Sequence, residues 1–276
     1  MDPLRPTREE ALAGWARRVR ENREQVDRFR GVEDGADFYA PVASMFRANP
    51  HRTDEPVLDV LRSLVQPDET WLDIGAGGGR YALPIALAAR EVIALEPSDG
   101  MLAILREGMA EHGIDNVRIE QTRWPSPARV EADVALISHV GYDIEEIGPF
   151  LDVMEAAARR LCVAVLLFRQ PTYPIDQLWP AVHGEARAML PALPEFLALQ
   201  LARGKQFEVR LSGRQPQTYE SVDQAVAFAR RQTWVRPGSD QERRLQDVIA
   251  GSLQQRAGRY AFTWEPAPVA VVTWAP

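Results

Sequence analysis

One stretch of the sequence combines an acidic residue with four glycines in a pattern that could bind a nucleoside. It reads Asp73-Ile74-Gly75-Ala76-Gly77-Gly78-Gly79-Arg80, and the apolar run 71–74 leads into it. Glycines let the backbone approach a ligand closely, and a helix expected to begin near Arg80 would present free N–H groups. Glu96 ends the next apolar run, where a carboxylate can accept both hydroxyl protons of a ribose. These residues predict a site for a nucleoside-containing ligand.

The spacing of the glycines distinguishes between several known kinds of nucleotide-binding loop. The dinucleotide pattern G-x-G-x-x-G fails at its sixth position, which is Arg80. The phosphate loop G-x-x-x-x-G-K-[ST] fails because no lysine follows. The pattern D-x-G-x-G-x-G fits, with Asp73, Gly75, Gly77 and Gly79. This loop resembles the first motif of class I S-adenosylmethionine-dependent methyltransferases, and the turn after Glu96 resembles the second.

The resemblance implies that the chain binds S-adenosylmethionine and assigns residues to it. Glu96 would bind the ribose, with Pro97 and Met101 near the adenine. Asp73 would lie near the methionine ammonium group, although it could also anchor its own loop. Trp124 lies in the loop that follows the third strand in this family, where it could stack on the purine or fill a core edge. The full set of predicted cofactor-binding residues is Asp73, Gly75, Ala76, Gly77, Gly79, Glu96, Pro97, Met101, Arg123, Trp124 and Ser138.

The predicted catalytic residues follow the fourth strand. Residues 133–138 form an apolar run that leads into His139 and Tyr142. Ligands of open α/β sheets bind at the carboxyl ends of strands, so these side chains should face the methyl group and its acceptor. Methyl transfer from a sulfonium requires alignment and exclusion of water, and a base only if the acceptor must lose a proton. His139 is the candidate base because its ordinary pKa lies near neutrality, but it could also contact a ligand or be structural. No metal site is predicted.

Apolar runs alternate with helical patterns from residue 70 to residue 168, which indicates a doubly wound parallel α/β sheet. The resemblance implies a Rossmann-like, mostly parallel seven-stranded sheet with an antiparallel last strand. A short loop between runs 260–264 and 269–274 permits a hairpin but no parallel crossover. The predicted parts are a helical segment or lid, the cofactor-binding core, a mainly helical insertion or cap, and a closing hairpin of the core sheet, at residues 1–66, 67–168, 169–259 and 260–276. Tyr39 and Arg47 are the candidate contacts of the lid.

The composition indicates which classes of partner the protein binds. The net charge is −7, and an acidic chain is a poor general partner for nucleic acid, whose affinity depends on lysine and arginine. Cys162 is the only cysteine, which suits a reducing compartment, and no run approaches the ~20 apolar residues of a membrane span. These observations predict a cytoplasmic protein acting on a small molecule, with no membrane partner and no prediction of oligomeric state.

Several alternatives stay open on the sequence alone. A methyltransferase acting on RNA or protein would need a basic groove. An aminopropyl transferase would need paired acids near the fourth strand, and Asp143, Glu145 and Glu146 lie there. A nicotinamide oxidoreductase is opposed by Arg80. A non-catalytic module that binds S-adenosylmethionine would keep the glycines and Glu96 but lack activity.

Overall fold

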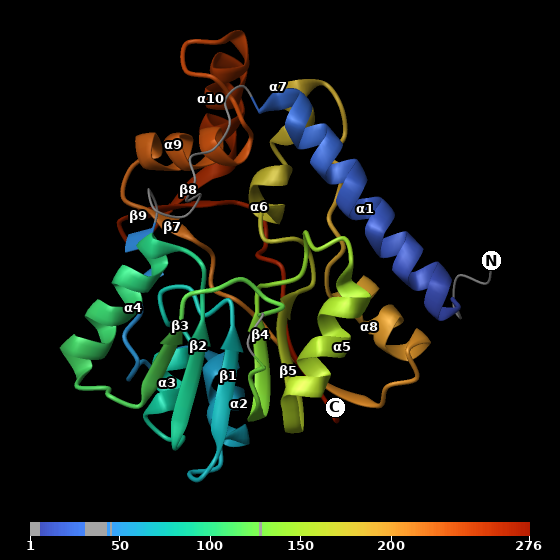
Figure 1. Ribbon diagram of the computed structural model, residues 1–276. Helices are drawn as coiled ribbons and strands as arrows, with labels where there is room; N and C mark the ends of the chain where they lie inside the picture. The colour runs from blue at the N-terminus through green and yellow to red at the C-terminus, as the bar shows by residue number, and fades with distance from the viewer. Residues whose placement is uncertain (1–5, 31–42, 45, 127–128) are drawn as a thin grey trace.

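Seven strands form the central sheet of the computed structural model, which describes residues 6–30, 43–44, 46–126 and 129–276 (Figure 1). The strand order is β3-β2-β1-β4-β5-β10-β6, and only β10 runs antiparallel to its neighbours. The predicted fold class is therefore confirmed. Tyr39, predicted as a lid residue, lies outside the described residues. The strands of the sheet are β1 (Thr70–Ile74), β2 (Glu91–Leu95), β3 (Val117–Glu120), β4 (Ala132–Ser138), β5 (Ala158–Leu167), β6 (Phe207–Ser212) and β10 (Val269–Trp274).

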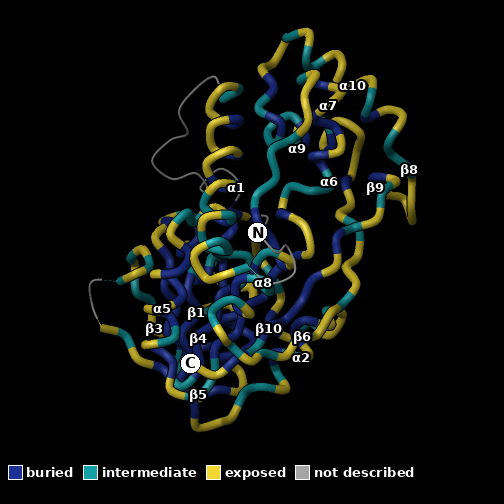
Figure 2. The backbone as a smooth tube through the Cα atoms, turned by 90° about the vertical axis from the view of Figure 1, so that its right-hand side faces the viewer, coloured by how far each residue is buried: buried dark blue, intermediate teal, exposed yellow. Residues whose placement is uncertain are grey.

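Helices cover both faces of this sheet. The buried apolar residues of β1, β4 and β5 form near-continuous runs, as a parallel sheet covered on both faces requires. Helix α2 lies on one side of the sheet and α5 on the other (Figure 2). Ser98 caps α4 by accepting the Met101 N–H at 3.1 Å, as its side chain predicts. The helices of the core are α1 (Arg8–Phe29), α2 (Pro56–Leu64), α3 (Ala82–Ala86), α4 (Asp99–His112), α5 (Ile147–Ala157) and α8 (Leu193–Ala202).

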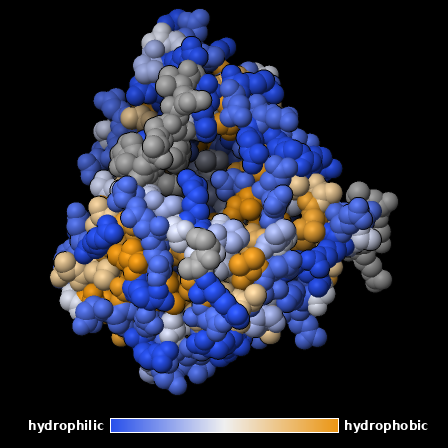
Figure 3. Space-filling model, in the orientation of Figure 1, coloured by the Kyte–Doolittle hydropathy of each residue, from blue (hydrophilic) through white to orange (hydrophobic). Residues whose placement is uncertain are grey.

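A second, smaller body stands above one edge of the sheet, and we call it the cap (Figure 1). Its own apolar core includes Leu178, Leu245 and Phe262. Seen from the side of Figure 1, the surface is hollowed between cap and sheet (Figure 3). The elements of the cap are α6 (Tyr173–Asp176), α7 (Trp179–His183), α9 (Val222–Gln232), α10 (Asp240–Ser252), β7 (Thr218–Tyr219), β8 (Leu253–Arg256) and β9 (Arg259–Phe262).

The chain passes between sheet body and cap four times, and besides the passage from α7 to α8, three of these passages lie at the same edge of the sheet. It leaves after Leu167 and after Ser212, and it returns at Val269. These three residues are in register, because Val269 lies opposite Leu167 on one side and Ser212 on the other. This is the edge at which β4 ends, since Ser138 pairs with Val165. The cap therefore faces the carboxyl ends of the parallel strands.

Two predicted boundaries are wrong. Residues 260–276 do not form a closing hairpin, because β9 pairs with β7 and β8 in the cap while β10 inserts between β5 and β6. The interior position suits β10, which buries Val269, Ala270, Val271, Val272 and Trp274. Residues 169–259 are not one insertion either. Within them, α8 and β6 belong to the sheet body, because Leu193, Phe196 and Leu199 are buried in its core.

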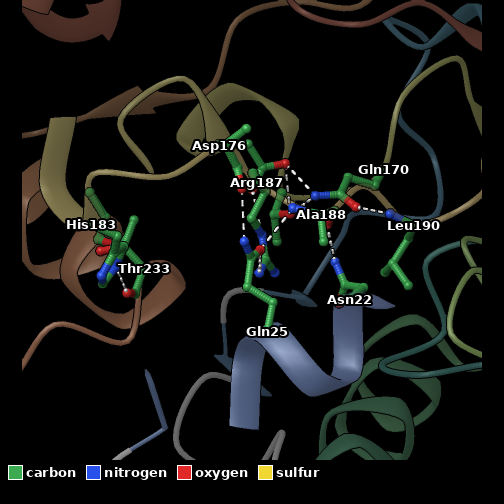
Figure 4. A network of polar contacts seen from close by, with 12 residues as sticks. Asn22, Gln25, Gln170, Asp176, His183, Arg187, Ala188, Leu190 and Thr233 are labelled. Atoms are coloured by element: carbon green, nitrogen blue, oxygen red, sulfur yellow. Dashed lines mark hydrogen bonds and ion pairs between the residues drawn. The ribbon is translucent and has the colours of Figure 1, made fainter. Parts of the chain in front are cut away.

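Helix α1 joins the cap to the sheet body. In its first half, the Trp15 indole donates to the Ile144 carbonyl oxygen at 2.9 Å. In its second half, Gln25 and Asn22 are buried against the loop at Ala188 (Figure 4). The Gln25 amide oxygen accepts the Ala188 N–H at 2.7 Å, and the Asn22 amide donates to the Ala188 carbonyl oxygen at 2.5 Å. Arg187, which directly precedes Ala188 in this loop, forms a buried ion pair with Asp176 at 3.5 Å.

The assignment of α8 to the sheet body is testable. Phe196 is 1% exposed and meets the Trp274 ring edge-on at 5.7 Å, whereas Leu201 on the same helix is 66% exposed. Phe196→Ala should lower the free energy of unfolding by about 3–5 kcal/mol, since it leaves a cavity. Leu201→Ala, the matched control, should change it by less than about 0.5 kcal/mol. Urea denaturation measures both, and equal effects would contradict the packing described.

Candidate functional site

The glycine loop takes a conformation that only glycine adopts easily. It leaves β1 with φ values of +77° at Gly75, +55° at Gly77 and +83° at Gly79. The N–H groups of Gly75 and Ala76 both donate to the Leu95 carbonyl oxygen, at 2.8 and 3.1 Å, which fastens the loop to the end of β2. A Cβ atom on Gly75 would lie 2.7 Å from Val140 Cγ2. The loop is therefore shaped by both its backbone and its neighbours.

Glu96 lies directly under the loop and is 6% exposed. Its carboxylate accepts the Gly77 N–H at 2.9 Å and the Ser98 N–H at 2.9 Å. Backbone N–H groups that donate to a carboxylate stabilise its charged form. The carboxylate is thus held in a fixed orientation between the loop and the start of α4, where the resemblance places the ribose contact.

Asp73 is the penultimate residue of β1, lies beside Glu96 and is 2% exposed. Its Oδ1 atom accepts no hydrogen bond within the described parts of the chain. Burial, together with the negative charge of Glu96, raises the pKa of Asp73 to about 7. A buried carboxylate oxygen without a donor costs free energy, and a cationic or hydrogen-bonding ligand would remove that cost.

The residues predicted to lie near the adenine differ in how far they are buried. Met101 is 3% exposed, and its Sδ atom would be 3.9 Å from a Cβ on Gly77, so it packs under the loop. Pro97 and Arg123 are exposed. The partly buried Trp124 packs against the core, with its indole N–H 3.5 Å from the Phe150 carbonyl oxygen.

The end of β4 brings the predicted catalytic residues together. His139 has φ +56°, uncommon for a residue with a side chain, and its N–H donates to the Val165 carbonyl oxygen at 2.9 Å. The Tyr142 hydroxyl lies 3.5 Å from His139 Nδ1 and accepts the Leu167 N–H at 2.7 Å. Tyr142 is 4% exposed, and burial raises the pKa of its phenol. Ser138, predicted for the cofactor, is partly buried just before His139.

His139 is neutral near pH 7. Burial, with the positive charges of Arg214 and Arg80, lowers the pKa of its imidazole to about 4. A neutral imidazole can donate one hydrogen bond and accept another, but with this pKa it is a weak proton acceptor.

A cavity of about 370 Å³ opens beside His139. Its lining includes Arg52, Glu55, Arg80, Tyr81 and Arg214. None of these residues was predicted as a site residue, although Arg80 and Tyr81 directly follow the glycine loop and Arg214 follows a strand-like run. Arg47, the candidate lid contact, instead pairs with Glu107 and Glu111 of α4.

Glu55 organises the polar side of this cavity. Its carboxylate accepts hydrogen bonds from Arg52 Nε at 2.7 Å, Arg80 Nη2 at 2.9 Å and the Tyr81 hydroxyl at 2.5 Å. Burial alone would raise the pKa of Glu55, but the Tyr81 hydrogen bond and the two arginine charges outweigh it and hold the pKa below its usual value. Glu55 is therefore ionised and fully engaged.

Comparisons with known proteins agree with this geometry. A family model described as "Methyltransferase domain" matches residues 72–161, from β1 to the start of β5. Over 82 residues the chain is 35% identical to the ribosomal RNA small subunit methyltransferase G of Neisseria gonorrhoeae. This match covers 28% of the chain and only 40% of that relative's length.

Two solved structures show the same fold over most of the chain. A methyltransferase from Geobacter sulfurreducens, crystallised with S-adenosyl-L-homocysteine, has a TM-score of 0.52 at 16% identity and covers 85% of this chain and 97% of its own. The magnesium protoporphyrin IX methyltransferase of Synechocystis PCC 6803, with the same ligand bound, has a TM-score of 0.51 at 12% identity and covers 94% and 97%.

The sheet and its glycine loop define the class as the Rossmann-like, class I methyltransferases. Residues 72–161 match the methyltransferase-domain model, and the sheet has the topology of this class, whose members use S-adenosylmethionine. In the part of the chain that the structure describes, no helix has the length and apolar character needed to cross a membrane. Residues 6–30, 43–44, 46–126 and 129–276 also hold no cluster of three metal-ligating acidic, histidine or cysteine side chains.

The shape of the glycine loop gives a test of the cofactor site. Gly75→Ala should weaken binding of S-adenosylmethionine at least about tenfold, because its methyl group meets Val140 and strains a left-handed backbone. Gly113→Ala is the control, since Gly113 also has positive φ but a Cβ there meets nothing within 4 Å. Calorimetry with both variants measures the affinity, and a normal affinity in Gly75→Ala would show that the ligand binds elsewhere.

Proposed function

We propose that the protein transfers a methyl group from S-adenosylmethionine to a small-molecule acceptor. The observation that carries this proposal is the pair of buried carboxylates, Asp73 and Glu96, at the carboxyl ends of two adjacent strands beside the glycine loop. Two close carboxylates in a buried site favour a ligand that brings positive charge and hydroxyl donors. S-adenosylmethionine has an ammonium group, a sulfonium and a ribose.

The same charges argue against a dinucleotide. A pyrophosphate at this loop would face Asp73 and Glu96, and like charges in a buried site repel strongly. The loop has no lysine after it, and Arg80 is already paired with Glu55. The site is thus better suited to a cationic nucleoside than to an anionic one, which disfavours the nicotinamide oxidoreductase.

Each residue has a separate role in the proposed reaction. When bound, S-adenosylmethionine supplies a methyl group activated by a positively charged sulfur. The glycine loop would admit the ligand. Glu96 would accept hydrogen bonds from its ribose hydroxyl groups, and Asp73 would accept hydrogen bonds from its ammonium group. His139 orients the acceptor by hydrogen bonding, because its low pKa makes it a poor base. Tyr142 acts as a positioning residue that holds the His139 ring against the end of β5.

A small acceptor is supported by the cavity beside His139. About 370 Å³ lies within the range of small-molecule pockets, and the cap stands over the same edge. The net charge of −7 is unfavourable for nucleic acid. An RNA acceptor is the second candidate, because the Neisseria relative is named as a ribosomal RNA methyltransferase. The buried Cys162 fits our prediction of a cytoplasmic location.

The main test compares the glutamate that begins β2, Glu91, with the glutamate that directly follows this strand, Glu96. Glu96→Ala should weaken binding of S-adenosylmethionine at least about tenfold, since it removes the carboxylate that fixes the loop. Glu91→Ala, at the opposite end of β2, is the control and should bind normally. Calorimetry with S-adenosylmethionine and NAD measures both ligands. Binding of NAD alone, or of neither, would refute the proposed function.

The raised pKa of Asp73 predicts pH dependence. Below about pH 7 the carboxyl holds a proton that the ammonium group must displace, so affinity for S-adenosylmethionine should rise roughly tenfold from about pH 6 to about pH 8. Stability of the ligand-free protein should change oppositely. A carboxyl whose pKa is higher in the folded state stabilises the fold below its unfolded pKa, and this stability is lost as pH rises through about 7.

The control for this prediction is Asp73→Asn, which cannot titrate. This variant should flatten the pH dependence of the affinity, measured by titration calorimetry. It should also flatten the pH dependence of the melting temperature, measured by differential scanning calorimetry. An unchanged pH dependence in Asp73→Asn would assign the titration to another group.

A further inference from the structure

Three arginines line the cavity beside His139, and they differ in their partners. Arg52 donates to Glu55, and also to the carbonyl oxygens of Asn49 and Arg80, at 3.1 and 2.9 Å. Its side chain is only 12% exposed, so it is a structural element of the wall. Arg80 shares the Glu55 carboxylate at 2.9 Å but leaves half of its side chain exposed.

Arg214 differs from both. It lies just after β6, in the segment that leads to the cap, and it lines the cavity while its residue is exposed to solvent. Within residues 6–30, 43–44, 46–126 and 129–276, no carboxylate pairs with it and no acceptor takes a hydrogen bond from it. Its charge nevertheless reaches the reaction site, because Arg214 and Arg80 both lower the pKa of His139.

The charges of the cavity do not balance. Asp54 and Glu55 oppose Arg52, Arg80 and Arg214, and Glu55 is already used by the first two arginines. The Arg214 guanidinium has no carboxylate partner among the described residues, and the planar fork of a guanidinium matches the two oxygens of a carboxylate or phosphate. A negatively charged group of a ligand would balance the excess positive charge of the residues that line the cavity.

We propose that the methyl acceptor carries an oxyanion, a carboxylate or a phosphate, which Arg214 binds in the cavity beside His139 with support from Arg80. This inference rests on the proposed function and adds the chemical class of the acceptor. The oxyanion anchors the acceptor at one end while His139 orients it. Amine acceptors are excluded, because the surplus positive charge repels them.

The first experiment measures anion binding directly, with S-adenosyl-L-homocysteine present to fill the cofactor site. The probes share a phenyl ring and differ in charge: benzoate, phenyl phosphate, neutral benzamide and cationic benzylamine. Ligand-detected NMR titration should show binding of the two anions and not of the other two. The stronger of the two anions then identifies the acceptor's group as a carboxylate or a phosphate.

Variants assign the binding to Arg214. Arg214→Gln should weaken the anion affinity at least about tenfold, because a charged hydrogen bond is lost. Arg214→Lys should keep more affinity than Arg214→Gln, since the charge remains. Arg210→Gln is the matched control, because Arg210 lies on β6, is 53% exposed and pairs with Glu208 outside the cavity. It should bind the anions like the unmodified protein.

Three outcomes would overturn the proposal. Arg214→Gln could bind both anions normally, benzylamine could bind better than benzoate, or a short RNA could bind in the anions' place and lose affinity in Arg214→Gln. Affinity for S-adenosylmethionine is measured in parallel and should not change in Arg214→Gln. A loss there would assign Arg214 to the methionine carboxylate and also refute the proposal.

The two proposals fail separately. If the unmodified protein binds no S-adenosylmethionine, the proposed function falls. The anion titrations without S-adenosyl-L-homocysteine still decide whether Arg214 holds an oxyanion.

Discussion

The hydrogen bond from the Gly77 N–H to the Glu96 carboxylate holds the candidate site together. It joins the loop after β1 to the end of β2, and it can form only because these parallel strands end at the same level. The Ser98 N–H adds a second bond to the same carboxylate and so fixes the start of α4. Loop shape, helix entry and the position of buried charge beside Asp73 all depend on this one carboxylate. A ligand therefore meets a site that is already formed, which reduces the entropy lost on binding.

Local sequence patterns predicted the half of the molecule in which the site residues and the strands that position them lie close together in sequence. The glycine loop, the Ser98 cap and the strands from residue 70 to residue 167 are encoded by neighbouring residues. Residues 259–262 pair with two strands of the cap. One, β8, is adjacent in the chain, but the other, β7, lies 41 residues away, as for Tyr219 and Tyr260, and such a long-range pairing could not be predicted from local patterns. The cavity was missed for the same reason, since Glu55, His139 and Arg214 meet only after the sheet is assembled.

The division into two apolar cores would separate the proposed cofactor site from the acceptor site. The sheet body contains the glycine loop and its carboxylates, while the cap has its own buried cluster and is joined to the sheet by three passages of the chain at the edge near His139. The segment bearing Arg214 is one of the three connections at this edge. Substitutions in these connections can change which acceptor fits without disturbing the cofactor loop. This explains how a common fold accommodates different acceptors, and why fold alone does not identify one.

Helix α1 acts as a lever between distant parts of the molecule. Its 22 residues span about 33 Å, a rigid rod at about 1.5 Å per residue. One end is held by the cap through Gln25, and the other contacts the segment after β4, where Trp15 binds the Ile144 carbonyl oxygen. Any rocking of the cap must therefore tilt this rod and pull on the segment that carries His139 and Tyr142. Helix α1 thus couples the position of the cap to that of the segment between β4 and α5.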